Sequence, residues 1–267
     1  MMRNRLMCGA GAAVMLFVGM SIATRASAHM PYVLPALFDA GSRTQITLEA
    51  SFTEDAFRPE IAMRDAPFEI TAPDGRTTRL AAPALAGDRT IAQASLPSDG
   101  IYRLSSGQRA GRSGKMYRKG DDWVMVGEGA APPTGVTLVD VRSMTLADSY
   151  VVRGRPGAKG AFTPRGKALE IRPLTDPTAL SARDVARFEI LYDGKPLVGR
   201  TVTMFREAGL YDGRKQVGQV TSDAAGTVVV TPPDPGRYLV LVRHRPATPN
   251  TSGGYASYTT TLALEVG

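Results

Sequence analysis

Residues 43–52 read Arg-Thr-Gln-Ile-Thr-Leu-Glu-Ala-Ser-Phe, and polar and apolar side chains alternate along this stretch. In an extended chain, the apolar side chains of Ile46, Leu48 and Ala50 lie on one face. The polar side chains of Gln45, Thr47 and Glu49 lie on the other. A period of two residues is typical of a β-strand with one buried face. We therefore predict a half-buried strand here.

The rest of the chain repeats this organisation in short segments separated by turn residues. Asp-Gly pairs such as 74–75 and 193–194 supply the positive φ values that tight turns between strands need. Further strands are expected at 68–72, 76–80, 91–96, 101–104, 123–126, 136–141, 149–153, 169–174, 188–192, 201–205, 217–221, 227–231, 237–245 and 258–266. No stretch beyond the first 28 residues shows sustained helical periodicity, so we expect an all-β fold.

Two basic, glycine-rich segments organise this β-rich chain. Residues 154–166, GRPGAKGAFTPRG, have the composition of an interdomain linker. We predict two Ig-like or transthyretin-like β-sandwich domains, at 29–155 and 167–267, joined by a linker at 156–166. Residues 105–120, SSGQRAGRSGKMYRKG, are expected to form a loop that is either a solvated connection or a contact for an anionic partner.

The first 28 residues have the features of a signal peptide. A basic start precedes an apolar run over 6–23, and Ala26 and Ala28 match the A-x-A cleavage pattern. Cleavage after Ala28 would place the protein in the periplasm with His29 as its first residue. An uncleaved leader would instead form a membrane anchor, because the run is about as long as the roughly 18 residues of a short membrane span. The mature chain is not expected to span a membrane.

The mature chain has a small net charge and no cysteine. The full sequence has a formal charge of +7, and removing three leader arginines leaves 29 basic and 25 acidic side chains, or +4. Such a mild excess gives little support for nucleic-acid binding, so no nucleic-acid partner is expected. The single cysteine, Cys8, lies in the leader, which excludes disulfides and thiolate metal sites from the mature chain.

The two histidines of the chain, His29 and His244, are the candidate metal ligands. After cleavage, His29 would offer its α-amine and its imidazole to one metal ion. The imidazole of His244 would complete a three-nitrogen set, a histidine brace, and such ligands favour copper or nickel. The alternative is that His29 begins a mobile terminus and His244 is a surface residue between Arg243 and Arg245.

No motif indicates catalysis, so we expect the protein not to be an enzyme. G-x-S-x-G, H-E-x-x-H, P-loop and dinucleotide-binding patterns are absent from the sequence. The carboxylate pairs at 54–55 and 121–122 could bind calcium or act as acid and base. They are expected instead to be solvated turn residues, because adjacent residues on a strand point to opposite faces.

Three segments resemble a family of bacterial periplasmic proteins. Residues 166–177, GKALEIRPLTDP, match the pattern G-x-x-L-E-(I/V)-x-P-L-x-(D/N)-P, and residues 193–202, DGKPLVGRTV, match G-K-P-L-x-G-x-x-V. Residues 28–35, AHMPYVLP, are similar to a start that reads A-H-x-x-W-L-x-P, with Tyr32 near the usual tryptophan. The chain thus resembles domain-of-unknown-function family 4198, which is associated with a nickel-uptake substrate-specific component. Its C-terminal half is also similar to transthyretin-like modules of carboxypeptidase regulatory domains.

The resemblance implies a non-enzymatic periplasmic component that binds or delivers nickel, cobalt or copper. His29 would be the primary ligand and His244 a second one, and the partners would be one transition metal ion and an outer-membrane receptor or inner-membrane transporter. The alternative is a metal-free envelope module that docks on such a receptor or transporter through its sheet edges and residues 105–120. A copper oxidase with a histidine brace is a third hypothesis, which would need an open axial position.

Overall fold

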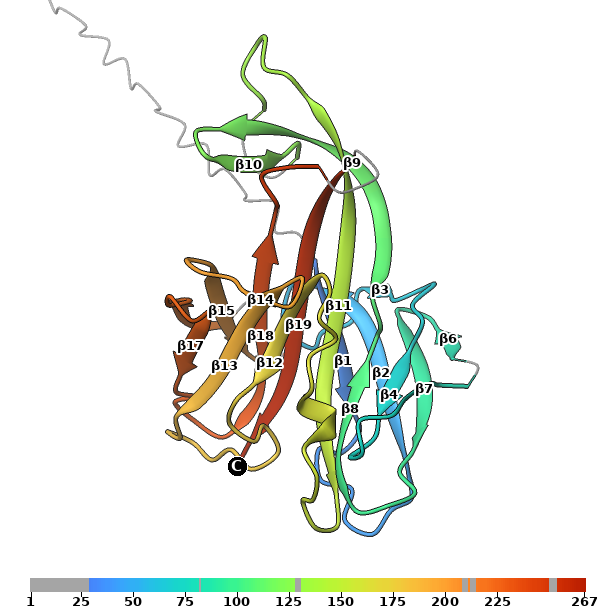
Figure 1. The fold of residues 1–267 in the computed structure, drawn as a ribbon. Coiled ribbons are helices and arrows are strands. Elements are labelled where there is room, and N and C mark those ends of the chain that lie inside the picture. Colours follow the sequence, from blue (N-terminus) through green and yellow to red (C-terminus); the bar gives the residue numbers. More distant parts are fainter. Residues whose placement is uncertain (1–28, 82, 128–130, 208–210, 212–214, 250–253) are drawn as a thin grey trace, which may run out of the picture.

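The computed structural model describes residues 29–81, 83–127, 131–207, 211, 215–249 and 254–267. The predicted signal peptide, residues 1–28, lies outside this part. The described residues form three β-sheets and one 3-10 turn, η1 (Gly160–Phe162), without an α-helix (Figure 1). The predicted all-β fold class is therefore confirmed. Within the same residues, no helix has the length and apolar character needed to cross a membrane.

The N-terminal sheet contains five strands in the order β1-β2-β7-β6, with β3 paired to β2. Their bounds are β1 (Met30–Pro35), β2 (Gln45–Thr53), β3 (Ile61–Ala62), β6 (Ala84–Ala86) and β7 (Arg89–Ser95). β1 lies at the edge, where the missing N–H groups of Pro31 and Pro35 are tolerated. The first half of β2 alternates between exposed and buried residues as its sequence predicts.

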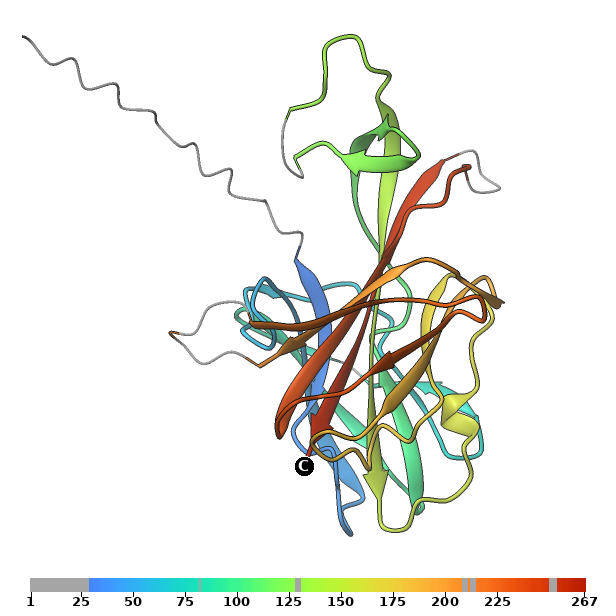
Figure 2. The same cartoon turned by 90° about the vertical axis from the view of Figure 1, so that its left-hand side faces the viewer.

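The central sheet contains ten strands in the order β16-β15-β18-β19-β11-β8-β4-β5, with β9 paired to β11 and β10 paired to β9. Their bounds are β4 (Glu69–Thr71), β5 (Thr77–Arg79), β8 (Gly100–Ser105), β9 (Arg109–Lys119), β10 (Asp122–Met125), β11 (Val139–Arg153), β15 (Thr201–Arg206), β16 (Lys215–Thr221), β18 (Gly236–His244) and β19 (Tyr255–Val266). β11 and β19 pair in parallel from Val141 and Tyr255 to Ser149 and Ala263. This pairing makes one sheet out of strands from both halves of the chain (Figures 1 and 2).

The C-terminal sheet covers one face of the central sheet. It consists of β12 (Leu169–Pro173), β13 (Ala186–Tyr192), β14 (Lys195–Pro196) and β17 (Thr227–Val230). Apolar side chains of this sheet share a core with alternate residues of β18 and β19, including Leu169, Phe188, Val228, Val240 and Leu262. Burying these side chains stabilises the C-terminal half by the hydrophobic effect.

The N-terminal sheet covers the opposite face of the central sheet. Its core includes Val33, Leu48 and Ala94, which pack with Leu104 of β8 and Val151 of β11. β1 reaches further across the sheet, since its side chains also pack on strands from the C-terminal half, in a cluster that includes Met30, Tyr32, Leu34, Phe205, Leu239 and Leu241. Hence every residue of β1 is buried, although β1 is the edge strand of its own sheet.

Residues 160–166, the second half of the predicted linker, pack against the central sheet, whereas residues 156–159 are exposed. Phe162 is buried, and its ring centroid lies 5.3 Å from that of Tyr150 on β11. The Arg165 guanidinium donates two hydrogen bonds to the carboxylate of Asp148 on β11. The backbone N–H of Arg165 donates to the carboxylate of Glu170 on β12. The division into domains at 29–155 and 167–267 stays a prediction, and the structure adds that both halves share the central sheet.

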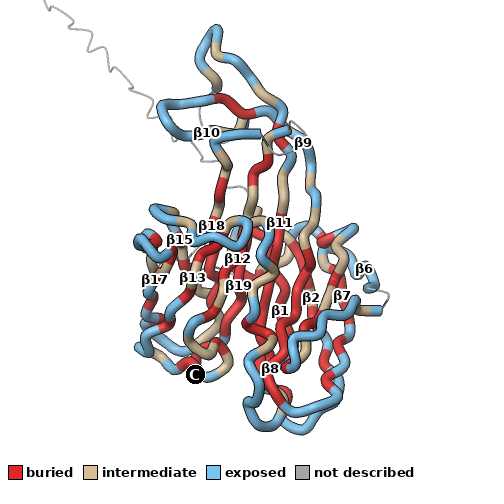
Figure 3. Tube along the Cα trace, in the orientation of Figure 1, coloured by how far each residue is buried: buried red, intermediate tan, exposed pale blue. Residues whose placement is uncertain are grey.

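Two expectations about local structure were wrong. Residues 105–120, expected as a loop, mostly form β9, because their backbone pairs with β11 on one side and with β10 near the tip. Residues 136–141 and 149–153, expected as two strands, belong largely to the single strand β11, whose polar middle is held between neighbouring strands. The β9–β10 hairpin extends beyond the buried core and is largely exposed (Figure 3).

Candidate metal site

Three side chains that can bind a metal ion meet at the end of β2. They belong to His29, Glu54 and Glu60. β1 pairs antiparallel with β2, and Met30 lies opposite Thr53. The next residues outward from this pair are His29 and Glu54, which explains why segments distant in the sequence lie together. Glu60 immediately precedes β3, which also pairs with β2.

The ligand atoms of this cluster are close enough to bind one ion. One ligand atom from each residue lies within 4.8 Å of the others. His29 Nε2 and Glu60 Oε2 are 3.0 Å apart, and the backbone N–H of Glu54 donates to Glu60 Oε1 at 2.9 Å. Bond lengths of about 2.0–2.2 Å from zinc to nitrogen or oxygen place neighbouring ligands of a tetrahedral site about 3.3–3.6 Å apart. The 3.0 Å between His29 and Glu60 is a hydrogen-bond spacing that a shift of a few tenths of an ångström would open to this distance.

The cluster is open to solvent. The side chains of His29 and Glu60 are 36% and 38% exposed. One imidazole nitrogen and two carboxylate groups form a mixed donor set that suits divalent transition metals such as nickel, copper and zinc. In the absence of an ion, the 3.0 Å contact between His29 Nε2 and Glu60 Oε2 holds the two side chains side by side.

His244 lies in a different environment, at the end of β18. It is 7% exposed, and its ring packs at 4.6 Å from the ring of Tyr192 on β13. Burial and the nearby Arg200 guanidinium lower the pKa of His244 to about 4. The imidazole is therefore neutral at pH 7, and His244 is not a surface residue.

The structure does not bring His29 and His244 together. Along β18, Val240 and Val242 face the C-terminal sheet, and His244 follows them on that face. Leu239 and Leu241 face β1, the strand that His29 precedes. The central sheet thus lies between the two histidines, so the three-nitrogen set expected from the sequence is not formed by these positions.

Sequence reasoning missed two members of the cluster. Glu54 was interpreted as a solvated turn residue, although pairing of residues 30–35 with the strand at 45–53 would have placed it beside His29. Glu60 gives no signal by its spacing, because a two-residue strand brings it to the site.

Comparisons with known proteins identify a family but no activity. No curated protein matches the chain. Among solved structures, trypsin-activated α2-macroglobulin from Escherichia coli is 12% identical with a TM-score of 0.24, over 92% of this chain and 16% of that one. The adhesin InvE of Yersinia pseudotuberculosis is 11% identical with a TM-score of 0.24, over 88% of this chain and 60% of that one. The D0-D1 domain of intimin is 11% identical with a TM-score of 0.22, over 88% and 97%.

The chain therefore spans a small part of the first of these proteins, and similarity at this level carries no argument about function. The family comparison is much more extensive. The family model described as "Domain of unknown function (DUF4198)" matches residues 26–246, a range that includes the His29 cluster, His244 and the three resembling segments. Because this match covers most of the sequence, the chain belongs to the DUF4198 family.

Proposed function

We propose that this protein is a periplasmic component that binds one divalent transition metal ion and delivers it to an uptake system, without catalysing a reaction. The observation that carries the proposal is the convergence of His29, Glu54 and Glu60 within 4.8 Å. His29 remains the primary ligand. Glu54 and Glu60 take the place that the sequence assigned to His244.

The amino terminus strengthens the donor set. Cleavage after Ala28 frees the α-amine of His29, which closes a chelate ring together with its imidazole. Two nitrogens and one or two carboxylate oxygens then surround the ion. Copper(II) and nickel(II) bind such nitrogen-containing sites more tightly than manganese or iron(II) do, so we expect one of these two ions to be the cargo.

The exposure of the cluster suits delivery. Structural zinc sites are closed by four protein ligands, whereas sites that exchange a ligand keep an open position. His29 and Glu60 are each more than a third exposed, which leaves room for a receptor or transporter to approach the ion. An ion in this position would reach a partner without unfolding of the core.

Calorimetric titration of the exported protein tests the proposal. The protein is expressed with its own leader, its intact mass is measured to establish cleavage after Ala28, and the metal-free form is titrated with nickel(II) and copper(II). We expect one ion per chain. The variants His29→Ala and Glu60→Gln should each weaken binding at least about tenfold, because even second-shell changes at metal sites cost that much.

Two variants serve as controls. Glu265→Gln removes a similarly exposed carboxylate at the end of β19, 3.8 Å from Arg237, and His244→Ala removes the other histidine. Both should bind metal as the unmodified protein does. Equal, weak binding by all variants would contradict the proposal and favour the metal-free docking module.

A further inference from the structure

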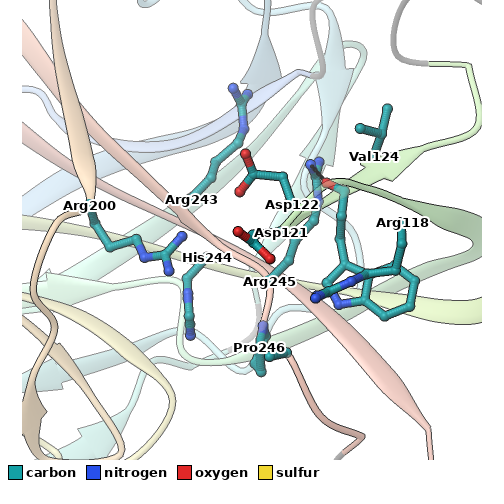
Figure 4. A pocket seen from close by; sticks show the side chains of 11 residues that line it. Arg118, Asp121, Asp122, Val124, Arg200, Arg243, His244, Arg245 and Pro246 are labelled. Carbon is teal, nitrogen blue, oxygen red and sulfur yellow. Dashed lines mark hydrogen bonds between the residues drawn. The ribbon is translucent and has the colours of Figure 1, made fainter.

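A pocket of about 560 Å³ lies at the end of β18, on the part of the molecule covered by the β9–β10 hairpin. Its lining includes His244 and Arg245 from the end of β18, Arg200 from the turn before β15, and Arg118 and Trp123 from the hairpin (Figure 4). The volume falls within the range of about 300–1,000 Å³ typical of small-molecule sites. We call it the arginine pocket.

The lining of the arginine pocket is strongly cationic. Four arginines, Arg118, Arg200, Arg243 and Arg245, face two aspartates, Asp121 and Asp122, which gives a net charge of +2 with His244 neutral. Figure 4 shows Arg200 and Arg118 on opposite sides of the pocket. Guanidinium groups bind carboxylates and phosphates through paired hydrogen bonds, so a ligand with anionic groups at both ends could contact both sides.

Several polar groups of the lining lack a partner for hydrogen bonding. Among the described residues, no atom bonds Trp123 Nε1, Arg200 Nε or His244 Nδ1, although all three nitrogens are buried. Buried polar groups are nearly always bonded in native proteins, and exceptions require an explanation. A bound molecule with several oxygen acceptors would satisfy the indole and guanidinium nitrogens, and His244 Nδ1 in the tautomer that carries its proton there, after small side-chain movements.

The position of the hairpin over the pocket is fixed by specific contacts. Arg245 Nη1 donates to the backbone oxygen of Trp123 at 3.0 Å, and Arg245 Nε donates to Ser257 Oγ at 3.1 Å. The ring of Trp123 packs at 4.8 Å from that of Tyr255, and the Arg118 guanidinium lies 5.2 Å from the Trp123 ring. These contacts hold the hairpin side of the pocket in place before a ligand enters, which lowers the entropic cost of binding.

From the charge, the unpartnered nitrogens and the volume, the geometry points to a binding site for a small molecule that carries two or more carboxylate or phosphate groups. This site is independent of the proposed metal site, since His244 and His29 lie on opposite faces of the central sheet. The carboxylates Asp121 and Asp122 tune the affinity, because they lower the positive charge that the ligand meets.

Trp123 is the single tryptophan of the chain and lines the pocket, so its fluorescence reports on binding there. Metal-free protein is titrated with acetate, succinate and citrate in one series, and with inorganic phosphate and pyrophosphate in another. We expect a saturable change in emission whose affinity rises with the number of anionic groups. The series that binds more tightly assigns the ligand as a carboxylate or as a phosphate.

Charge variants test the location of the site. Arg200→Met should weaken binding about tenfold or more, since hydrogen bonds to charged groups are the strong ones. Asp121→Asn should strengthen it about two- to fivefold, as expected for removal of one partly screened charge. Arg187→Met makes the same charge change on an exposed position of β13, outside the pocket, and should leave binding unchanged.

Thermal unfolding of each variant establishes that it is folded. His29→Ala should bind the anions as the unmodified protein does, so failure of the metal site does not affect this test. The proposal is overturned if no anion gives a saturable change at millimolar concentrations. It is equally overturned if Arg200→Met and the unmodified protein bind citrate and pyrophosphate alike.

Discussion

Replacing Arg165 with methionine is expected to destabilise the protein strongly, because Arg165 is the direct partner of Asp148 in a buried cluster between the two halves of the chain. Its guanidinium donates to both oxygens of Asp148 at 2.9 Å and to Ser105 Oγ at 2.8 Å, and lies 3.4 Å from Glu69. The side chains of Arg165 and Asp148 are 12% and 4% exposed. The variant would leave Asp148 as a buried carboxylate without its two-pronged partner.

The magnitude follows from the burial of Asp148. Removing one partner of a buried ion pair costs about 3–5 kcal/mol, because the other charge stays out of water. Burial raises the pKa of Asp148, but Arg165 and, to a smaller extent, Arg103 lower it by more, so this pKa lies below its usual range. Since Arg103 remains in the variant, we expect a loss near the lower limit, about 3 kcal/mol.

Urea unfolding followed by circular dichroism measures this loss. The double variant Arg165→Met with Asp148→Asn, which buries no charge at this pair, should be about 2 kcal/mol more stable than the single variant. Without Arg165 the pKa of Asp148 rises, so the folded single variant takes up a proton on this carboxyl as the pH falls. The difference in unfolding free energy between the single variant and the unmodified protein should therefore narrow from pH 7 to about pH 4.5. A stability difference below about 1 kcal/mol, the value of an exposed pair, or a difference that acid does not narrow would mean that Arg165 and Asp148 do not form a buried ion pair of this strength.

Two further changes test the fold around the sites. The pKa of His244 is lowered from 6.5 to about 4 by burial and Arg200, so the unfolded chain takes up this proton first and stability falls between about pH 6.5 and 4. Over that range, the unfolding free energy of the variant His244→Gln, measured by urea titration, should fall by about 3 kcal/mol less than that of the unmodified protein. The same dependence of stability on pH in both proteins would exclude a buried neutral imidazole. Gly160→Ala should cost about 1–3 kcal/mol in the same assay, because strain is expected from crowding of the added carbon. That carbon would lie 2.4 Å from the backbone nitrogen of Gly75, whereas nothing in the described part of the chain lies within 4 Å of one added at Gly157. Gly157→Ala is therefore the matched control, and equal stability of the two variants would mean that the segment is not packed.

The fold class could be predicted from the sequence because it depends on local patterns. The alternation of β2 buries Ile46, Leu48 and Ala50 as expected. The extent of β9 and β11 could not be predicted, because their glycines, arginines and polar residues have no strand pattern of their own. These segments are extended because each pairs with strands that the chain supplies elsewhere, β9 with β10 and β11, and β11 with β8 and β19.

The candidate metal site could be predicted only in part for the same reason. The leader pattern singles out His29, and alternation along the strand at 237–245 puts His244 on the face of Val240 and Val242, where the structure has it. β1 covers one face of the strand at 237–245. Which of the two faces it covers depends on tertiary packing, which no local sequence pattern reveals. Glu60 contacts His29 because the two-residue strand β3 pairs with β2, and a strand this short leaves no recognisable pattern in the sequence.

Electron paramagnetic resonance of the exported protein with one equivalent of copper(II) tests whether His29, with Glu54 and Glu60, binds the metal ion. Coupling to nitrogen identifies imidazole and amine ligands. We predict imidazole nitrogen coupling in the unmodified protein and in His244→Ala, and its loss in His29→Ala, where the α-amine is the one nitrogen of this residue that can still bind copper. Imidazole coupling that persists in His29→Ala and disappears in His244→Ala would contradict this assignment.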